Sequence, residues 1–175
     1  MSHVISKFDI SASAPSVVGG TGTTIKRFVN RPPAQQMVGP GITLVNPNPS
    51  DQLLLPFSGS TDGQHFEVYI SGSVSAAVGR VTYLIQTNDI TLAGGSHTPR
   101  DIDIPFIFSL GLLGHSATGI MIGSFEGMIG GVLTKGALTP FPVRASLSLS
   151  VGVIFEESAA ENKALLTEFR AVQKG

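Results

Sequence analysis

One short string in the chain has the residue types of a hydrolase site. Gly114-His115-Ser116-Ala117-Thr118 differs by one residue from the pattern Gly-x-Ser-x-Gly, in which a tight turn exposes a nucleophilic serine, because Thr118 stands where the second glycine belongs. In that arrangement the histidine that accepts the serine proton follows the serine in the chain. All four histidines, at positions 3, 65, 97 and 115, precede Ser116. The chain order therefore predicts a polar turn at this string, and a protein that is not an enzyme.

Ligands for a metal or a cofactor are equally sparse. The histidines show no spacing of two or four residues from one another, and the chain has no cysteine, so no zinc or iron site is indicated. Asp101 and Asp103 would share one face of a strand, near Asp89, and could offer oxygen ligands to calcium. A solvated loop edge is favoured over a calcium site, because no further acidic residues cluster around them. The segment 19–22 lacks the Gly-Lys-Ser/Thr ending of a phosphate-binding loop. The sequence predicts no cofactor.

Nucleic acid and membranes are poor matches for the charge pattern. The formal net charge is -1, and Lys26, Arg27, Phe28 and Arg31 form the only group in which basic and aromatic residues interleave. The longest stretch without Asp, Glu, Lys or Arg, residues 104–125, is long enough for a membrane helix, but glycine and proline break it into two apolar bursts. We expect two buried strands joined by a loop there, no membrane span and no nucleic-acid partner.

The elements that would position any site are indicated by alternation with a period of two. From Val143 to Phe155 the odd-numbered residues are apolar, whereas most even-numbered ones are serine, glycine or arginine, and residues 66–75 alternate in the same way. This pattern is typical of strands with one buried face. The chain is therefore predicted to be all-β, an antiparallel, jelly-roll-like β-sandwich. Shorter strands are expected at 53–57, 81–86, 104–110 and 120–134, the last long and glycine-rich enough to require a bulge.

The last segment, residues 156–174, carries two conflicting signals. It is rich in good helix formers, yet Leu165, Thr167 and Phe169 alternate with their neighbours as in a strand. An antiparallel sandwich commonly needs a last strand to cover an open edge. We favour a loop or short helical turn followed by a strand, with a helix as the alternative.

Residues 1–50 differ from residues 51–175 in charge and in content of turn formers. The first segment carries four basic residues against one acidic residue, a net of +3, whereas the second carries seven basic and eleven acidic residues, a net of -4. Pro32-Pro33, Gly39-Pro40-Gly41 and the repeated Asn-Pro at 46–49 disfavour a helix or a central strand. We expect an extended N-terminal arm with edge strands at 24–29 and 41–46, ahead of a β-sandwich domain at 51–175; a loop-rich edge of the same domain is the alternative.

The low charge of the chain favours assembly. Charged residues make up 13% of it and hydrophobic ones 42%, and across residues 104–155 the only formal charges are Glu126, Lys135 and Arg144. Such a surface leaves apolar patches that a partner would cover. An arm carrying Lys26, Arg27 and Arg31 could add a strand to a neighbouring, acidic body, so these three residues are the candidate assembly site.

In layout the chain resembles small jelly-roll virion structural proteins of bacteriophages, either capsid decoration (cement) subunits or single-barrel coat proteins. The resemblance rests on the punctuated segment 11–49, on Phe66-Glu67-Val68-Tyr69-Ile70-Ser71-Gly72, on the strand 147–155 and on the closing Ala164-Leu165-Leu166-Thr167-Glu168-Phe169. It implies a non-enzymatic subunit that self-assembles as a homo-oligomer, perhaps a trimer, and stabilises a particle. Its partners would be copies of itself and a major capsid protein or other virion proteins, and its place would be the virion, assembled in the host cytoplasm.

A carbohydrate- or receptor-binding sandwich, like a lectin or a fibre tip, is the alternative function. Carbohydrate sites commonly use exposed aromatic side chains, but the chain has no tryptophan and only two tyrosines, Tyr69 and Tyr83. Both fall within predicted strands, where we expect them to pack in the core. A small β-structured hydrolase is the third reading, which the order of the histidines disfavours most.

Overall fold

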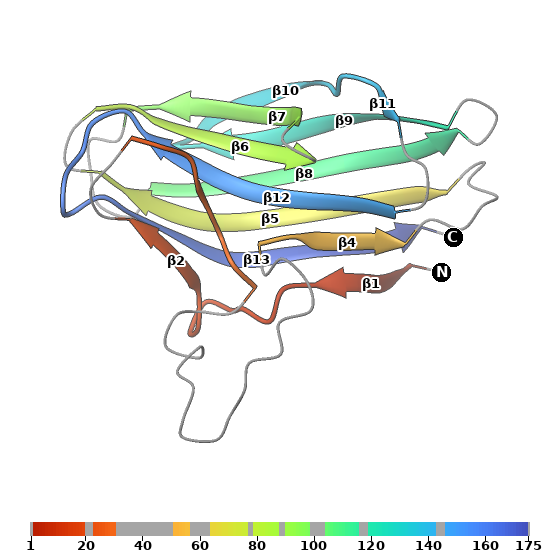
Figure 1. Cartoon of the computed structure of the whole chain (residues 1–175), viewed down its shortest axis with the longest axis horizontal. Helices are drawn as coiled ribbons and strands as arrows, with labels where there is room; N and C mark the ends of the chain where they lie inside the picture. The colour runs from red at the N-terminus through yellow and green to blue at the C-terminus, as the bar shows by residue number, and fades with distance from the viewer. Residues whose placement is uncertain are drawn as a thin grey trace.

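The chain folds into two antiparallel β-sheets packed face to face, as Figure 1 shows for the computed structural model. The structure describes residues 2–19, 23–30, 51–56, 64–76, 79–87, 90–98, 104–115, 119–142 and 146–174. Thirteen strands and no helix are found in these ranges, which confirms the prediction of an all-β sandwich. The described part of the chain also contains no helix long and apolar enough to cross a membrane.

The larger sheet has eight strands. Its order is β1-β13-β5-β8-β9-β10, with β2 also pairing with β13 and β11 also pairing with β9. The two ends of the described chain meet in this sheet, where His3 is the register partner of Gln173. The bounds of its strands are β1 His3–Lys7, β2 Ser16–Gly19, β5 His65–Ser75, β8 Ile104–His115, β9 Ile120–Ile129, β10 Val132–Ala137, β11 Phe141–Pro142 and β13 Lys163–Lys174.

The smaller sheet has five strands. Its order is β3-β12-β6-β7, and β4 pairs with β12 beyond the end of β3. The bounds are β3 Lys26–Arg27, β4 Leu53–Pro56, β6 Val81–Thr87, β7 Ile90–His97 and β12 Ser146–Phe155.

The core lies between the two sheets and follows the predicted alternation. On β12, Leu147, Leu149, Val151, Val153 and Phe155 are all at most 3% exposed, which confirms the buried face for the described part of that strand. On β5, the even-numbered residues from Phe66 to Ile70 are fully buried, whereas their odd-numbered neighbours are only half-buried. The residues left on the outer faces are therefore those that can meet a ligand or a partner.

The segment 104–125 forms two strands joined at residues 116–119, as expected. The region 120–134, in contrast, is not one bulged strand. Gly130 and Gly131 adopt φ values of +55° and +81°, so the chain reverses in a two-residue hairpin between β9 and β10. Two adjacent glycines satisfy this left-handed turn without steric cost, so the irregularity that the sequence predicted in this region is a turn and not a bulge.

One further strand, β7, was not predicted, and another, β13, decides between the helix and the strand considered for the last segment. β7 occupies residues 90–97, where the alternation predicted no strand. β13 confirms the favoured interpretation of the last segment, a loop followed by a strand. β13 joins the two N-terminal strands to the rest of the larger sheet, because it pairs with β5 on one side and with both β1 and β2 on the other.

The described parts of the first fifty residues lie on the sandwich of their own chain. Phe8 and Phe28 are 4% and 0% exposed and belong to the common core, and the backbone N–H of Phe28 donates to the carbonyl of Val151 at 2.9 Å. Residues 31–50, including the expected strand at 41–46, lie outside the described residues. The boundary at residue 50 and the reach of an arm to a neighbouring subunit therefore stay predictions.

Candidate functional site

Two of the three predicted assembly residues contact their own chain. Lys26 Nζ donates to the backbone oxygen of Gly19 at 2.7 Å, and Arg27 Nη2 donates to Oε1 of Gln86 at 3.2 Å. Their strand β3 pairs with β12, with Lys26 opposite Val153 and Arg27 opposite Gly152. Both side chains are half-buried in this setting, whereas Arg31 lies outside the described residues. Their use in assembly stays a prediction.

The other candidate residues from the sequence fall largely outside the described ranges. Ser116 and the aspartates at 89, 101 and 103 are among them, and His115 is described only as the last residue of β8. Within the described ranges, no group of three His, Asp or Glu side chains is placed to hold a metal ion.

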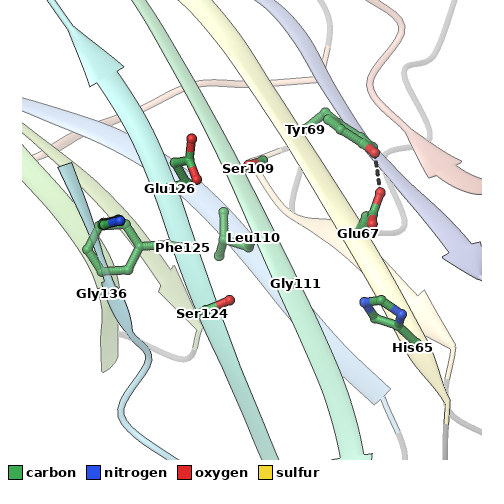
Figure 2. A pocket seen from close by; sticks show the side chains of 11 residues that line it. His65, Glu67, Tyr69, Ser109, Leu110, Gly111, Ser124, Phe125, Glu126 and Gly136 are labelled. Carbon is green, nitrogen blue, oxygen red and sulfur yellow. Dashed lines mark hydrogen bonds between the residues drawn. The ribbon is translucent and has the colours of Figure 1, made fainter. Parts of the chain in front are cut away.

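An open trough lies on the outer face of the larger sheet. It has a volume of about 830 Å³ and runs across β5, β8, β9 and β10 (Figure 2). Strand register creates it: Tyr69, Ser109, Glu126 and Lys135 are successive cross-strand partners, and Glu67, Gly111 and Ser124 form the next such line. The residues that line it are His65, Glu67, Tyr69, Ser109, Leu110, Gly111, Ser124, Phe125, Glu126, Lys135 and Gly136.

The floor of the trough is low because its residues are small. Gly111 is the cross-strand partner of Ser124, and Ser109 lies two residues before Gly111 on β8 (Figure 2). A Cβ atom placed on Gly111 would lie 3.8 Å from Nε2 of His65 and 3.9 Å from Oγ of Ser124, which are ordinary van der Waals contacts. Gly111 therefore leaves room for a ligand between these two polar groups, although the local backbone would accept a side chain.

The wall formed by β5 and β13 is held by a network of charged groups. The hydroxyl of Tyr69 donates to the carboxylate of Glu67, as Figure 2 shows, and Lys174 Nζ lies 2.9 Å from the same carboxylate. The guanidinium carbon of Arg170 lies 4.3 Å from the centroid of the Tyr69 ring, and Arg170 Nε also pairs with Glu168. A cation over an aromatic face and a shared hydrogen bond fix the position of Tyr69 before any ligand arrives.

The same network sets the protonation state of the wall. The hydrogen bond from Tyr69 and, second, that from Lys174 lower the pKa of Glu67, while the hydrogen bond to Glu67 raises the pKa of Tyr69. At neutral pH the wall therefore presents a carboxylate and a protonated phenol. It offers hydrogen-bond acceptors and donors but no activated nucleophile.

The opposite wall carries one acid and one base. Glu126 on β9 and Lys135 on β10 are register partners, and both side chains are exposed. Together with the serine hydroxyls of the floor they surround the trough with groups that can both donate and accept hydrogen bonds.

Apolar side chains border the trough on both sides along the strands. Ile107, Met128 and Leu133 are successive cross-strand partners and are 57%, 47% and 55% exposed. On the other side Leu113 faces Ile122, at 42% and 43% exposed. A polar strip between two apolar borders suits a ligand that has both hydroxyl groups and C–H faces.

The sequence placed only one of the two tyrosines correctly. Tyr83 is fully buried in the core, as expected, but Tyr69 is half-buried on the outer face and lines the trough. Tyr69 has an odd number and therefore lies on the same outer face of β5 as Glu67 and Ser71. The alternation of residues 66–75 could have predicted that Tyr69 faces outward.

Comparison with known proteins yields distant structural neighbours only. No family model matches the sequence, and no curated protein matches it. Among solved structures, lectin II from Ulex europaeus aligns over 100% of this chain and 92% of its own, with 7% identity and a TM-score of 0.43. Peanut lectin in complex with a nine-residue peptide aligns over 99% and 98%, with 10% identity and a TM-score of 0.40. Arcelin-5, a lectin-like defence protein from Phaseolus vulgaris, gives 8% identity and a TM-score of 0.39. We take no ligand or role from similarities this distant.

Proposed function

We propose that the chain is a non-enzymatic, carbohydrate-binding β-sandwich, and that the trough on the larger sheet is its binding site. The observation that carries the proposal is the composition of the trough: small outward-facing residues on its floor, a tyrosine held by Arg170 and Glu67, and carboxylate, hydroxyl and ammonium groups on facing walls. Sugars present hydroxyl groups that both donate and accept hydrogen bonds, together with C–H faces that pack on aromatic rings. The trough offers a partner for each.

The absence of enclosure fits binding better than catalysis. The trough is open along its length, so water reaches it, and a site that works by electrostatic stabilisation of a transition state usually excludes water. Glu67, its most strongly engaged acid, is already held as a carboxylate by Tyr69 and Lys174 and is not poised to donate a proton.

The test is glycan binding by the intact chain. A glycan array would identify candidate sugars, and titration calorimetry would measure their affinity for the wild type, Gly111→Val and Glu126→Gln. Valine suits a strand and fits the backbone at position 111, but it fills the floor, so we expect Gly111→Val to abolish binding while the protein stays folded. Glu126→Gln should weaken binding about tenfold, because a charged hydrogen-bond acceptor is replaced by a neutral one.

A matched control lies away from the trough. Glu161 is an exposed acid in the turn before β13, so Glu161→Gln changes the net charge by the same amount and should leave affinity unchanged. Failure to bind any glycan on the array, or equal affinity in the wild type and Gly111→Val, would show the proposal to be wrong.

A structural-subunit function is the second candidate. It is supported by six exposed aliphatic side chains on the outer face of β8, β9 and β10: Ile107, Leu113, Ile120, Ile122, Met128 and Leu133. A monomer that exposes such a surface gains by covering it. In this proposal the chain would decorate or build a virion, with a major capsid protein or other virion proteins as partners. Co-sedimentation of the purified chain with phage particles tests it, and particles that leave the chain in the supernatant would rule it out.

A further inference from the structure

Strand β10 forms one edge of the larger sheet, and no described strand pairs with its outer side. Its composition favours pairing with another strand. Among the described residues β10 pairs only with β9, and it does so without interruption over all six of its residues. Val132 and Leu133 are 64% and 55% exposed, and the strand contains no proline. A flat, apolar and unpaired edge is a template for another strand.

The other described edges carry features that discourage pairing. β1 contains a register shift between Val4 and Ser6, and β4 is short and ends at Pro56. β7 has adjacent glycines at 94 and 95, and its pairing with β6 is irregular at Ile85 and Gln86. Bulges, proline, short length and charged side chains are known ways of protecting an edge, and β10 has only one of these features, the charge of Lys135.

The hairpin determines which backbone groups of β10 point outward. In a two-residue hairpin the flanking residues, here Ile129 and Val132, form a hydrogen-bonded pair, and bonded and non-bonded pairs then alternate along the ladder. Leu133 and Lys135 fall in non-bonded pairs. Their N–H and C=O groups therefore face the open edge, where they can bond to another strand without disturbing β9.

The charge of Lys135 disfavours one register for a symmetric pair. If β10 meets β10 of a second copy in antiparallel orientation, a twofold axis at Lys135 would place two ammonium groups opposite each other, which is unfavourable. An axis at Thr134 instead places Leu133 opposite Lys135 of the second copy, and these are the residues whose backbone groups face the edge. The same register brings Val132 of one copy opposite Gly136 of the other.

The position of Gly136 adds apolar contact in this register. The Phe125 ring lies over Gly136, because a Cβ at that glycine would come within 3.1 Å of Cε1 of the ring. Phe125 is only partly buried in the described chain. Val132 of the second copy would therefore lie beside the Phe125 ring of the first copy, which the first copy alone leaves partly exposed.

We infer that two copies of this chain associate through antiparallel pairing of β10 with β10 about an axis at Thr134, forming one continuous sheet across the dimer. The pairing goes beyond the proposed carbohydrate binding and does not depend on it. Its consequence for that function is avidity: Lys135 lines the trough and also lies at the junction, so the two troughs would lie next to each other on one face.

A pair of substitutions that differ only in the sign of a charge tests the register. Leu133 is exposed, so both Leu133→Glu and Leu133→Lys should fold as the wild type does. Glutamate at 133 would face Lys135 of the second copy and form an ion pair, whereas lysine would face it with like charge. Because symmetry repeats each contact, we expect the dimer dissociation constant of Leu133→Lys to exceed that of Leu133→Glu by about tenfold or more at low salt.

Sedimentation velocity over a concentration series measures these constants without any ligand. Leu133→Pro removes both the leucine side chain and the edge-facing N–H, while Leu133→Ala removes the side chain and keeps the N–H. The proline variant should therefore be monomeric, and the alanine variant should still dimerise. Melting curves would show that the proline variant remains folded. A wild type that stays monomeric at several hundred micromolar, equal dissociation constants for the two charged variants, or a folded proline variant that dimerises like the alanine variant would each overturn the inference. Glycan binding by such a monomer would leave the proposed function intact.

Discussion

Gly72 and Gly111 lie on adjacent strands of the larger sheet but on opposite faces, and an alanine at each should have opposite effects. Gly72 on β5 faces the core. A Cβ atom placed there would lie 2.0 Å from the backbone oxygen of Leu165 on β13 and 2.5 Å from Cζ of Phe106. Neither neighbour can withdraw freely, because the first is backbone next to a register shift in β13 and the second is a fully buried ring.

The expected cost of Gly72→Ala follows from these contacts. Overpacking a well-filled core costs about 1–3 kcal/mol, and a clash with a backbone atom belongs at the upper end of that range. Replacing glycine by alanine also restricts the unfolded chain, which returns about 0.4–1 kcal/mol. The net destabilisation is about 2 kcal/mol, and for a chain of 175 residues this lowers the melting temperature by about 4–8 °C.

Gly111→Ala is the matched control, and its sign should be reversed. The added methyl group meets only ordinary contacts at 3.8 and 3.9 Å, so the restriction of the unfolded chain dominates and the melting temperature should rise by about 1–4 °C. Circular dichroism melts of the three proteins at one concentration would measure both shifts. Equal melting temperatures for wild type and Gly72→Ala, or a fall of similar size for both variants, would refute the placement of β13 against β5.

Four further substitutions test the core and the acid response. Leu149→Asp should prevent folding, because it buries an unpaired carboxylate at a cost of several kcal/mol, whereas Ser148→Asp on the opposite face should be tolerated; equal soluble yields would contradict the face assignment. Phe28→Ala should reduce the free energy of unfolding in urea by about 3–5 kcal/mol, because Phe28 is fully buried although it precedes the main domain in sequence; a loss below about 1 kcal/mol would argue against its place in the core. Burial lowers the pKa of His97, so the folded state takes up a proton less readily than the unfolded state, and stability should fall as the pH drops below the ordinary histidine range. His97→Gln should lose less stability than the wild type between pH 7 and pH 5, and urea midpoints that fall equally for both proteins would exclude His97 as the cause.

The strands that the sequence predicted share a simple physical property. β5, β6 and β12 lie with one face against the core, so burial selects apolar residues at every second position. The same reasoning identified β13 in spite of its helix-forming composition, because pairing with β5 along its length outweighs local propensity. Alternation reports burial, and burial is what these strands have in common.

The strands that the sequence missed are those for which burial is incomplete. β7 is an edge strand with two adjacent glycines and an exposed first residue, so its residues do not alternate in type. In β10 most residues are exposed, and the two glycines before it resemble a bulge as closely as a turn when pairing partners are unknown. An edge strand is stabilised by pairing with a single neighbouring strand, and the local sequence of the edge strand does not identify that neighbour.

The trough could not have been predicted as a site from any local motif. Tyr69, Ser109, Glu126 and Lys135 come from four strands and become neighbours only through the register of three strand pairs. A shift of one residue in any of these pairs would turn a whole strand over and bury its polar side chains. Register is set by the core residues between them, such as Val68, Leu110 and Phe125, which carry no chemistry of their own. The apolar alternation that predicted the fold is therefore also what assembles the polar site, and substitutions that shift a strand should abolish binding without touching a single side chain in the trough.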